Sequence, residues 1–242
     1  MKSYPLKKIF FVIVFEVLGS SYGFAFQGKS VMDTLKVSGY VDFNLYQDTR
    51  DFSTLTYNIL LQLSDRFQYF SLTNHDGNIG SPDLAVTYAE HNLRYKLHKN
   101  KPFELTLQYV LRNGEQNDDI KLGVRWRASE TKGLAQFFKK LNFFYSINPM
   151  IFQFRNLSKT KYATQLEHVY QIGILKDKLY LGGFADQIIN YNNKMSFDWV
   201  TEHQLGYKIY NNLFIVLEYR INDFFENENY GVGYGVEYKV RF

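Results

Sequence analysis

The chain has 242 residues, no cysteine and a formal net charge of +4. The charged residues of the first 25 positions, three lysines and one glutamate, carry +2 of this charge, and the remaining +2 is too small to indicate nucleic-acid binding. An exported chain without cysteine has no disulfides, so a hydrogen-bonded sheet or a packed core must hold it together. Twenty tyrosines and 22 phenylalanines beside four prolines favour strands over disorder.

The N-terminus has the pattern of a secretory signal. Lysines at positions 2, 7 and 8 precede an apolar run, residues 9–18, which only Glu16 interrupts, and small residues surround Ala25. This pattern predicts a signal peptide, residues 1–25, cut after Ala25, followed by a short periplasmic segment, residues 26–34. The run is too short to span a bilayer as a helix. An uncleaved anchor or a buried helix is the alternative.

From residue 35 onward, apolar and polar residues alternate with a period of two, which is typical of strands with one apolar and one polar face. Turn-forming residues, as at 64–66 and 211–212, separate segments of about ten residues, the length that a tilted strand needs to cross a bilayer. The predicted strands cover, in chain order, residues 35–47, 54–64, 67–74, 84–97, 103–112, 119–128, a seventh beginning near 141, and then 161–174, 179–186, 198–210, 213–222 and 232–242.

Four segments between these strands have a different pattern. Residues 75–82 and the Asn-rich residues 187–197 are predicted to be loops, and residues 131–139 have room for one short helical turn. Pro149 interrupts an apolar stretch at the far end of the seventh strand. Because proline cannot donate to a ladder, we expect the strand to end, bulge or be unpaired there.

The last strand is the most informative segment. From Val232 every second residue is valine or aromatic, the residues between them are glycine or charged, and the chain stops at Phe242. This ending resembles the closing strand of bacterial outer-membrane β-barrels, whose apolar face meets lipid and whose polar face lines the lumen. The resemblance implies that Tyr238, Val240 and Phe242 form the signal that the barrel-assembly machinery reads.

Together these patterns predict an all-β protein, a transmembrane antiparallel up-and-down β-barrel of about twelve strands over residues 35–242, in the outer membrane of a Gram-negative bacterium and surrounded by its lipids. Closure is expected because an open sheet would leave edge N–H and C=O groups unpaired in lipid. An even strand count places both termini on the periplasmic side. A secreted β-sandwich or lipocalin-like barrel is the alternative, and it would bury the apolar face.

The lumen is where we expect function. Opposite charges that face a narrow pore would select small polar or ionic solutes, or would pair across strands and plug the lumen. Arg112, Arg125 and Arg127 are predicted to be neighbours and to form a basic patch that attracts an anionic solute or neutralises nearby glutamates. The predicted luminal, solute-binding residues are Tyr40, Glu90, Arg94, Arg112, Arg125, Arg127, Glu167, Tyr180, Glu202, Glu218 and Arg220.

A Glu-His dipeptide occurs three times. The glutamates Glu90, Glu167 and Glu202 are predicted to face the lumen, as a binding ring or as salt-bridge partners of arginines, whereas the histidines after them face outward. Outward side chains on separate strands diverge, so these histidines predict no metal site.

No enzymatic pattern is found. Outer-membrane phospholipase A is also a twelve-stranded barrel with an outward Ser-His arrangement, but here the nearest pair on one face is Thr201 and His203, and threonine is a poor substitute. No phosphate-binding glycine loop or zinc spacing is present. Acidic residues at 76, 83, 118 and 119 allow calcium binding in loops but are also ordinary turn residues. We therefore predict no catalytic residue, metal or cofactor.

The chain resembles small twelve-stranded outer-membrane channels over roughly residues 35–242, and in size and aromatic richness it is nearest to the nucleoside-specific, Tsx-like family. That resemblance implies a monomeric channel for passive diffusion of small hydrophilic solutes, among them nucleosides, whose bases Tyr40 and Tyr180 would stack on. One alternative is a plugged structural barrel whose outer loops bind a partner. A remoter one is a lipid-modifying enzyme.

Overall fold

The computed structural model describes residues 37–78, 85–113, 118–155, 162–176, 178–191, 195–224 and 229–242. The predicted signal peptide and the segment 26–34 lie outside these residues. Within the described part, no helix has the length and apolar character needed to cross a membrane.

The described residues form twelve strands, one 3-10 turn (Ala128–Glu130) and one short helix, α2 (Ala135–Lys140). The strands are β1 (Ser38–Asp48), β2 (Phe52–Gln62), β3 (Phe67–Asn78), β4 (Ala85–Lys96), β5 (Phe103–Arg112), β6 (Asp119–Trp126), β7 (Phe143–Arg155), β8 (Tyr162–Ile174), β9 (Leu179–Tyr191), β10 (Met195–Tyr210), β11 (Leu213–Asn222) and β12 (Tyr230–Arg241).

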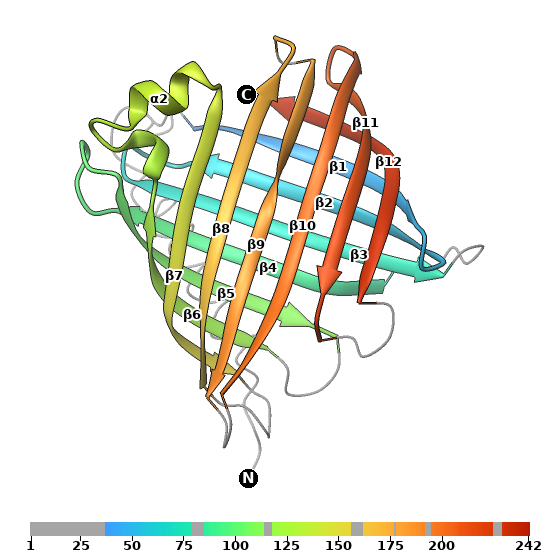
Figure 1. Ribbon diagram of the computed structural model, residues 1–242, viewed down its shortest axis with the longest axis horizontal. Coiled ribbons are helices and arrows are strands. Elements are labelled where there is room, and N and C mark those ends of the chain that lie inside the picture. The colour runs from blue at the N-terminus through green and yellow to red at the C-terminus, as the bar shows by residue number, and fades with distance from the viewer. Residues whose placement is uncertain are drawn as a thin grey trace, which may run out of the picture. The chain divides into compact units, whose positions relative to one another are not determined.

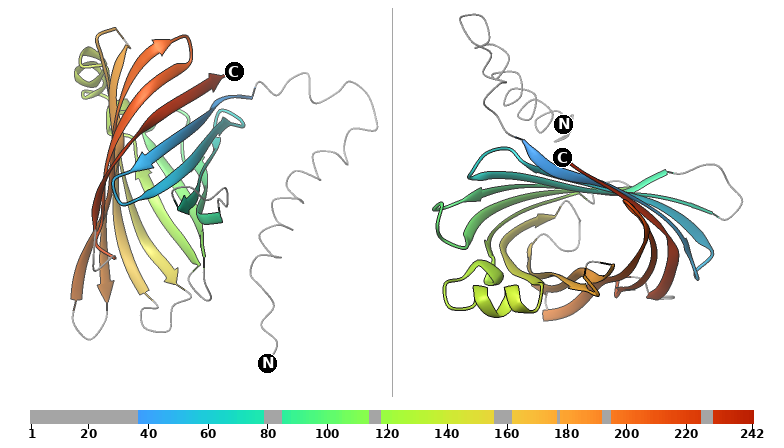
Figure 2. Two further views of the ribbon diagram at one scale, coloured as in Figure 1. Left: turned by 90° about the vertical axis from the view of Figure 1, so that its right-hand side faces the viewer. Right: turned by 90° about the horizontal axis from the view of Figure 1, so that it is seen from above.

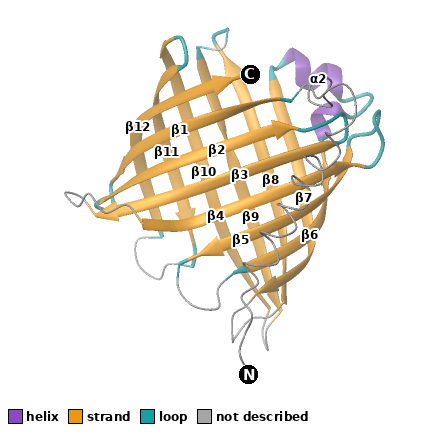
Figure 3. Cartoon of the chain, turned by 180° about the vertical axis from the view of Figure 1, so that it is seen from behind, coloured by secondary structure: helices purple, strands orange, loops and turns teal. Residues whose placement is uncertain are grey.

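Every strand pairs antiparallel with its neighbours in the sequence, and β12 pairs with β1 to close the ring. At this seam Phe43 lies opposite Tyr238 and Asn44 opposite Glu237. The strands of the two opposite walls cross at a steep angle (Figures 1 and 3), as the tilt of barrel strands requires. The predicted antiparallel up-and-down barrel of twelve strands is thus confirmed.

Apolar side chains lie on the outside of this barrel and polar ones on the inside. On β1, Phe43 is 47% exposed whereas the next residue, Asn44, is 2% exposed. The same alternation continues around the ring, where Leu105 and Ile215 are exposed and Glu218 is buried. A soluble β-sandwich would have the opposite arrangement, so the predicted faces of the strands are confirmed.

Glycine at the seam allows the ring to close. A Cβ atom added to Gly235 on β12 would lie 1.8 Å from the backbone oxygen of Leu45 on β1, a distance at which the backbones could not stay paired. Gly231 and Gly233 precede it on the same inward face. The inner face of β12 therefore offers space that larger side chains of other strands fill.

Parts of two predicted loops are strands instead. β3 continues to Asn78, and β9 continues to Tyr191, where it pairs with β10 from Met195. The prediction of an Asn-rich loop was therefore wrong for residues 187–191 and 195–197, and residues 79–82 and 192–194 lie outside the described part. Alternation continues through this segment, since the Ile189–Phe197 pair faces outward and the Asn190–Ser196 pair faces inward, and the ladder outweighs the turn preference of asparagine.

The strand β7 passes through Pro149 without ending. Its register shifts by one residue against both neighbours, between Met150 and Gln153 on the β8 side and between Leu122 and Gly123 on the β6 side. A bulge next to the proline was one of the predicted outcomes. Gly123 makes room for it, because a Cβ there would lie 2.3 Å from the Pro149 carbonyl oxygen.

The short helical turn predicted over 131–139 is present as α2. Asn142 follows it with a φ of 49°, the left-handed conformation that often ends a helix. α2 lies at the same end of the barrel as the C-terminus (Figure 1), and antiparallel order places the turns 63–66, 97–102, 175–178 and 211–212 there as well.

Candidate functional site

The lumen is the candidate functional site, because charged side chains from every part of the ring point into it. The strand registers place all eleven predicted luminal residues on the inward face. Which of them contact one another depends on the stagger between strands, and this stagger gathers ten of them, all except Arg112, into four clusters.

The first group is an arginine cluster made of Arg94, Arg125 and Arg127. The Arg125 and Arg127 guanidinium groups lie 3.5 and 3.3 Å from the carboxylate of Glu104. Arg94 and Arg125 also donate to the same acceptor, Gln68 Oε1, at 3.3 and 3.1 Å. Arg127 also pairs with Glu130, so three cations here face two carboxylates, and this side of the lumen is basic.

Arg112 faces the lumen as predicted, but the prediction that it neighbours Arg125 and Arg127 was wrong. Register places Glu104, not Arg112, opposite Arg125, and Arg112 lies at the other end of β5, where it pairs with Asp119 at 2.9 Å. Arg94 of β4 takes its place in the basic patch. Alternation in the sequence predicts which face of a strand a side chain lies on, but not its position along the barrel axis. That position determines that Arg125 contacts Glu104 and not Arg112.

The second group surrounds Lys121. Its ammonium donates to Gln165 Oε1 at 2.6 Å and interacts electrostatically with Glu90 and Asp186. Glu167 interacts in the same way with Glu90, Lys121 and Arg94. Lys121 therefore interacts with three carboxylates, of which Glu167 and Asp186 are paired neighbours on β8 and β9 and Glu90 lies on β4.

Asp186 is absent from the predicted set, although the alternation that starts at Tyr180 assigns it to the lumen. It pairs with Glu167 on β8 and Val200 on β10, both inward. A strict count of two along β9 would have found it.

The third group contains Glu202, Glu218 and Arg220. The Arg220 guanidinium contacts Glu218 and lies 3.6 Å from Glu202, and it also lies over the ring of Tyr46 at 5.2 Å. The three glutamates of the Glu-His dipeptides therefore do not form one ring. Glu90 and Glu167 belong to the Lys121 cluster, whereas Glu202 is a salt-bridge partner of an arginine.

The two aromatic candidates belong to a fourth group, around Lys239. The Lys239 ammonium lies 5.4 and 5.3 Å from the ring centres of Tyr40 and Tyr180 and 2.6 Å from Glu237. The Tyr180 hydroxyl lies within hydrogen-bonding distance of two acceptors, the Glu237 carboxylate and, at 2.8 Å, Gln204 Oε1. Both rings are thus engaged with a cation of the protein itself.

Several hydrogen bonds join strands that are three places apart in the ring. Arg125 of β6 reaches Gln68 of β3, and Gln204 of β10 reaches Asn44 of β1 at 3.1 Å. Tyr180 of β9 likewise reaches Glu237 of β12. Such bonds link parts of the wall that lie a quarter of the ring apart, so side chains fill part of the lumen.

Each of the three outward histidines is hydrogen-bonded to a tyrosine. His91, His168 and His203 each share a hydrogen bond between Nδ1 and a tyrosine hydroxyl, at 2.8, 2.8 and 2.7 Å. His203 contacts Tyr170 in this way, so it is not in a nucleophile–base contact with Thr201. Within the described ranges, no three His, Cys, Asp or Glu side chains form a potential metal site.

The acidic residues considered for calcium have other contacts. Asp76 accepts a hydrogen bond from Thr54 at 2.6 Å, and Asp119 pairs with Arg112. The Tyr109 hydroxyl donates to Asp118 at 3.4 Å. Asp83 lies outside the described residues.

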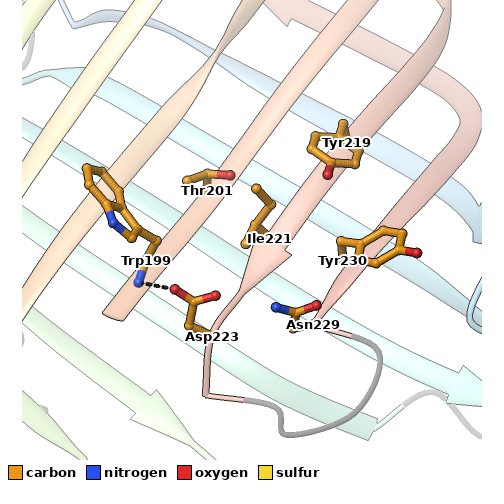
Figure 4. Close-up of a pocket in the computed structure, with 7 residues that line it drawn as sticks. All are labelled: Trp199, Thr201, Tyr219, Ile221, Asp223, Asn229 and Tyr230. Atoms are coloured by element: carbon orange, nitrogen blue, oxygen red, sulfur yellow. Dashed lines mark hydrogen bonds between the residues drawn. The ribbon is translucent and has the colours of Figure 1, made fainter. Parts of the chain in front are cut away.

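A shallow pocket lies on the outside of the barrel and does not belong to the passage (Figure 4). Most of its lining residues are outward residues of β10, β11 and the start of β12, at the end opposite α2, namely Trp199, Thr201, Tyr219, Ile221, Asp223, Asn229 and Tyr230. Aromatic side chains near the end of a transmembrane strand are typical of the girdle at a membrane interface.

No family model and no curated protein matches this sequence. Its structure is similar to that of the KdgM porin, with a TM-score of 0.51 and 16% identity over 82% of this chain and 98% of that one. The KdgM porin in complex with disordered oligogalacturonate gives a TM-score of 0.50 at the same identity and coverage. The NanC porin gives a TM-score of 0.55 with 9% identity over 83% of this chain and 100% of that one. The chain therefore has the fold of the small outer-membrane porins, a closed antiparallel barrel of twelve strands.

Proposed function

We propose that this chain is an outer-membrane channel through which small hydrophilic solutes diffuse passively. The observation that carries the proposal is the inverted distribution of side chains, apolar on the outer surface and charged on the inner one, in a ring that closes on itself. Only a lipid environment makes such an outer surface favourable. The proposal also includes a location in the Gram-negative outer membrane, termini on the periplasmic side, a signal peptide over residues 1–25 and a monomeric state.

The arginine cluster favours an anionic solute. Arg94, Arg125 and Arg127 present planar guanidinium groups, which match carboxylates well. KdgM, which shares the fold, was captured with oligogalacturonate, a polymer of acidic sugars. We therefore place short acidic saccharides first among the solutes. Nucleosides come second, because stacking a base on Tyr40 or Tyr180 requires Lys239 to leave both rings.

Conductance in planar bilayers tests the channel. The protein is expected to give discrete current steps, which galacturonate oligomers block at lower concentration than neutral oligosaccharides or nucleosides do. Replacing Arg125 and Arg127 together by glutamine should reduce the preference for anions several-fold, measured as a shift of the reversal potential in a salt gradient. Removing fixed positive charge from a narrow pore lowers the local concentration of anions.

A matched control is Lys208→Gln, which removes an inward charge outside the arginine cluster and should leave the selectivity nearly unchanged. The alternative is a plugged barrel whose outer loops bind a partner, and it is favoured by the hydrogen bonds inside the lumen that join strands three places apart. If the folded protein inserts into bilayers and carries no current, the channel is wrong and the plugged barrel is right.

Contact of the outer wall with lipid predicts that an arginine placed on this wall destabilises the barrel, and more so near the middle of a strand. Leu107, near the middle of β5, is expected to face the centre of the bilayer, and Leu107→Arg should lower the free energy of unfolding by about 2–4 kcal/mol. Phe103→Arg, at the end of the same strand and on the same face, should cost only about 0–1 kcal/mol. Urea unfolding in lipid vesicles measures both, and equal effects would contradict a membrane-spanning wall.

A further inference from the structure

The connection between β6 and β7 contains an apolar row that no other part of the described chain covers. Leu134, Phe137 and Leu141 are 40, 58 and 48% exposed. They are spaced i, i+3 and i+7, and the flanking residues 134 and 141 also have helical dihedral angles. The three side chains therefore lie along one face of α2.

This row is held in a fixed place on the outside of the barrel. Phe138, on the adjoining face of the helix, is buried, and its ring lies 5.3 Å from Phe143 and 6.4 Å from Tyr145, two outward residues of β7. In the view from above, α2 accordingly lies outside the ring of strands (Figure 2, right). The helix lies at the end of the barrel, between the last residue of β6 and the first of β7.

The preceding turn ties the segment to the mouth of the barrel. The Trp126 indole N–H donates to Thr131 Oγ1 at 2.8 Å. Glu130 pairs with Arg127 at 2.5 Å and with Lys96 at 3.2 Å, both of which are inward-facing. With one contact on the outer face and another inside the mouth, the connection cannot swing freely, and the direction of its apolar row is set.

Lysines flank the apolar row. Lys132, Lys139 and Lys140 are all exposed. Ion pairs elsewhere in the described residues have N–O distances of 2.5–3.7 Å, and none of these three lysines forms such a pair with a described residue. Lys139 and Lys140 occupy the last turn of the helix, where the helix dipole favours positive charge. Exposed apolar side chains beside unpaired lysines are the pattern of a segment that lies in a membrane interface.

We propose that residues 132–141 form an interfacial anchor, in which Leu134, Phe137 and Leu141 enter the leaflet at the α2 end and the three lysines bind anionic phospholipid headgroups. The proposal rests on the membrane location proposed above. The opposite charge of the headgroups selects lipid as the occupant, since each lysine near an anionic surface favours binding about five-fold. A periplasmic protein as the occupant is an outcome of the test.

The absence of cysteine allows one fluorescent label at a time. Gln136→Cys, exposed on α2, reports on the anchor; Leu105→Cys, on the outer wall, reports on insertion; and Asn100→Cys, in another turn at the same end, is the matched control. Each full-length labelled protein is folded into vesicles of zwitterionic lipid, with or without about 30% anionic lipid. Quenching is then measured with lipids that carry a nitroxide at the headgroup or deep in the acyl chain.

The anchor predicts strong headgroup quenching at position 136, more with anionic lipid, and little at position 100. Combining the label with Lys132→Gln, Lys139→Gln and Lys140→Gln should abolish the response to anionic lipid. If position 105 is quenched by the deep nitroxide but position 136 is not quenched at all, the anchor is wrong and the channel proposal stands, with a periplasmic partner the better occupant. If position 105 is also unquenched, the membrane location itself fails.

Discussion

Gly235→Ala is expected to prevent most of the protein from reaching the closed barrel. The added methyl group would lie 1.8 Å from the Leu45 carbonyl oxygen, and a backbone atom can move only by breaking the ladder between β12 and β1. Overpacking a rigid site costs about 1–3 kcal/mol, and sometimes more, and we expect the upper end here. Both the yield of folded protein in vesicles and the urea midpoint should fall.

The matched control lies two residues away on the same strand and the same face. A Cβ at Gly233 would meet nothing closer than a Tyr46 ring carbon at 3.6 Å, an ordinary contact. Gly233→Ala should therefore fold like the natural chain, or slightly better because alanine loses less entropy than glycine. Equal damage from the two changes would show that glycine is needed for flexibility and not for close approach at the seam.

Lys121→Met is expected to have the second large effect. It removes a cation that interacts with three carboxylates, Glu90, Glu167 and Asp186, which then repel one another more strongly inside the barrel. Removing one partner of a buried charge group typically costs about 3–5 kcal/mol. The free energy of unfolding should fall by this order, as measured by urea unfolding in vesicles.

A second change tests the cause. Glu167→Gln in the Lys121→Met background removes one of the repelling charges and should recover part of the loss, the signature of coupled residues in a double-mutant cycle. Lys208→Met, at an exposed inward position, should have almost no effect. If Lys121→Met is as mild as Lys208→Met, water in the lumen already screens these carboxylates, and the cluster does not stabilise the barrel.

Alternation along each strand was sufficient to predict which side chains point outward and which point into the lumen. It placed Glu218 inside and Leu217 outside, because a side-chain period of two leaves only two choices and the apolar set selects one. The terminal strand was the strongest case, since its small and charged inner face differs from its aromatic outer face over the whole of β12.

Strand ends and contacts between strands were harder to predict. Asparagine near positions 190–193 indicated a loop, but ladder bonds to β10 extend β9 to Tyr191. Arg112 and Arg125 are on adjacent strands and share a face, yet their strand pairing puts them at different heights. Contacts such as Arg125 with Gln68 depend on the stagger accumulated over three strands, which no local pattern contains.

The row of glycines inside β12 has a consequence for how such a barrel could change. Because the backbone there carries no bulk, large groups of other strands occupy the space beside it: Tyr46 lies next to Gly233, and the Tyr180 hydroxyl bonds to Glu237 of the same strand. Shortening one of them would enlarge the bore without altering strand number or tilt. In related barrels, single substitutions at these positions could therefore change which molecules pass. The strands that membrane insertion requires would stay the same.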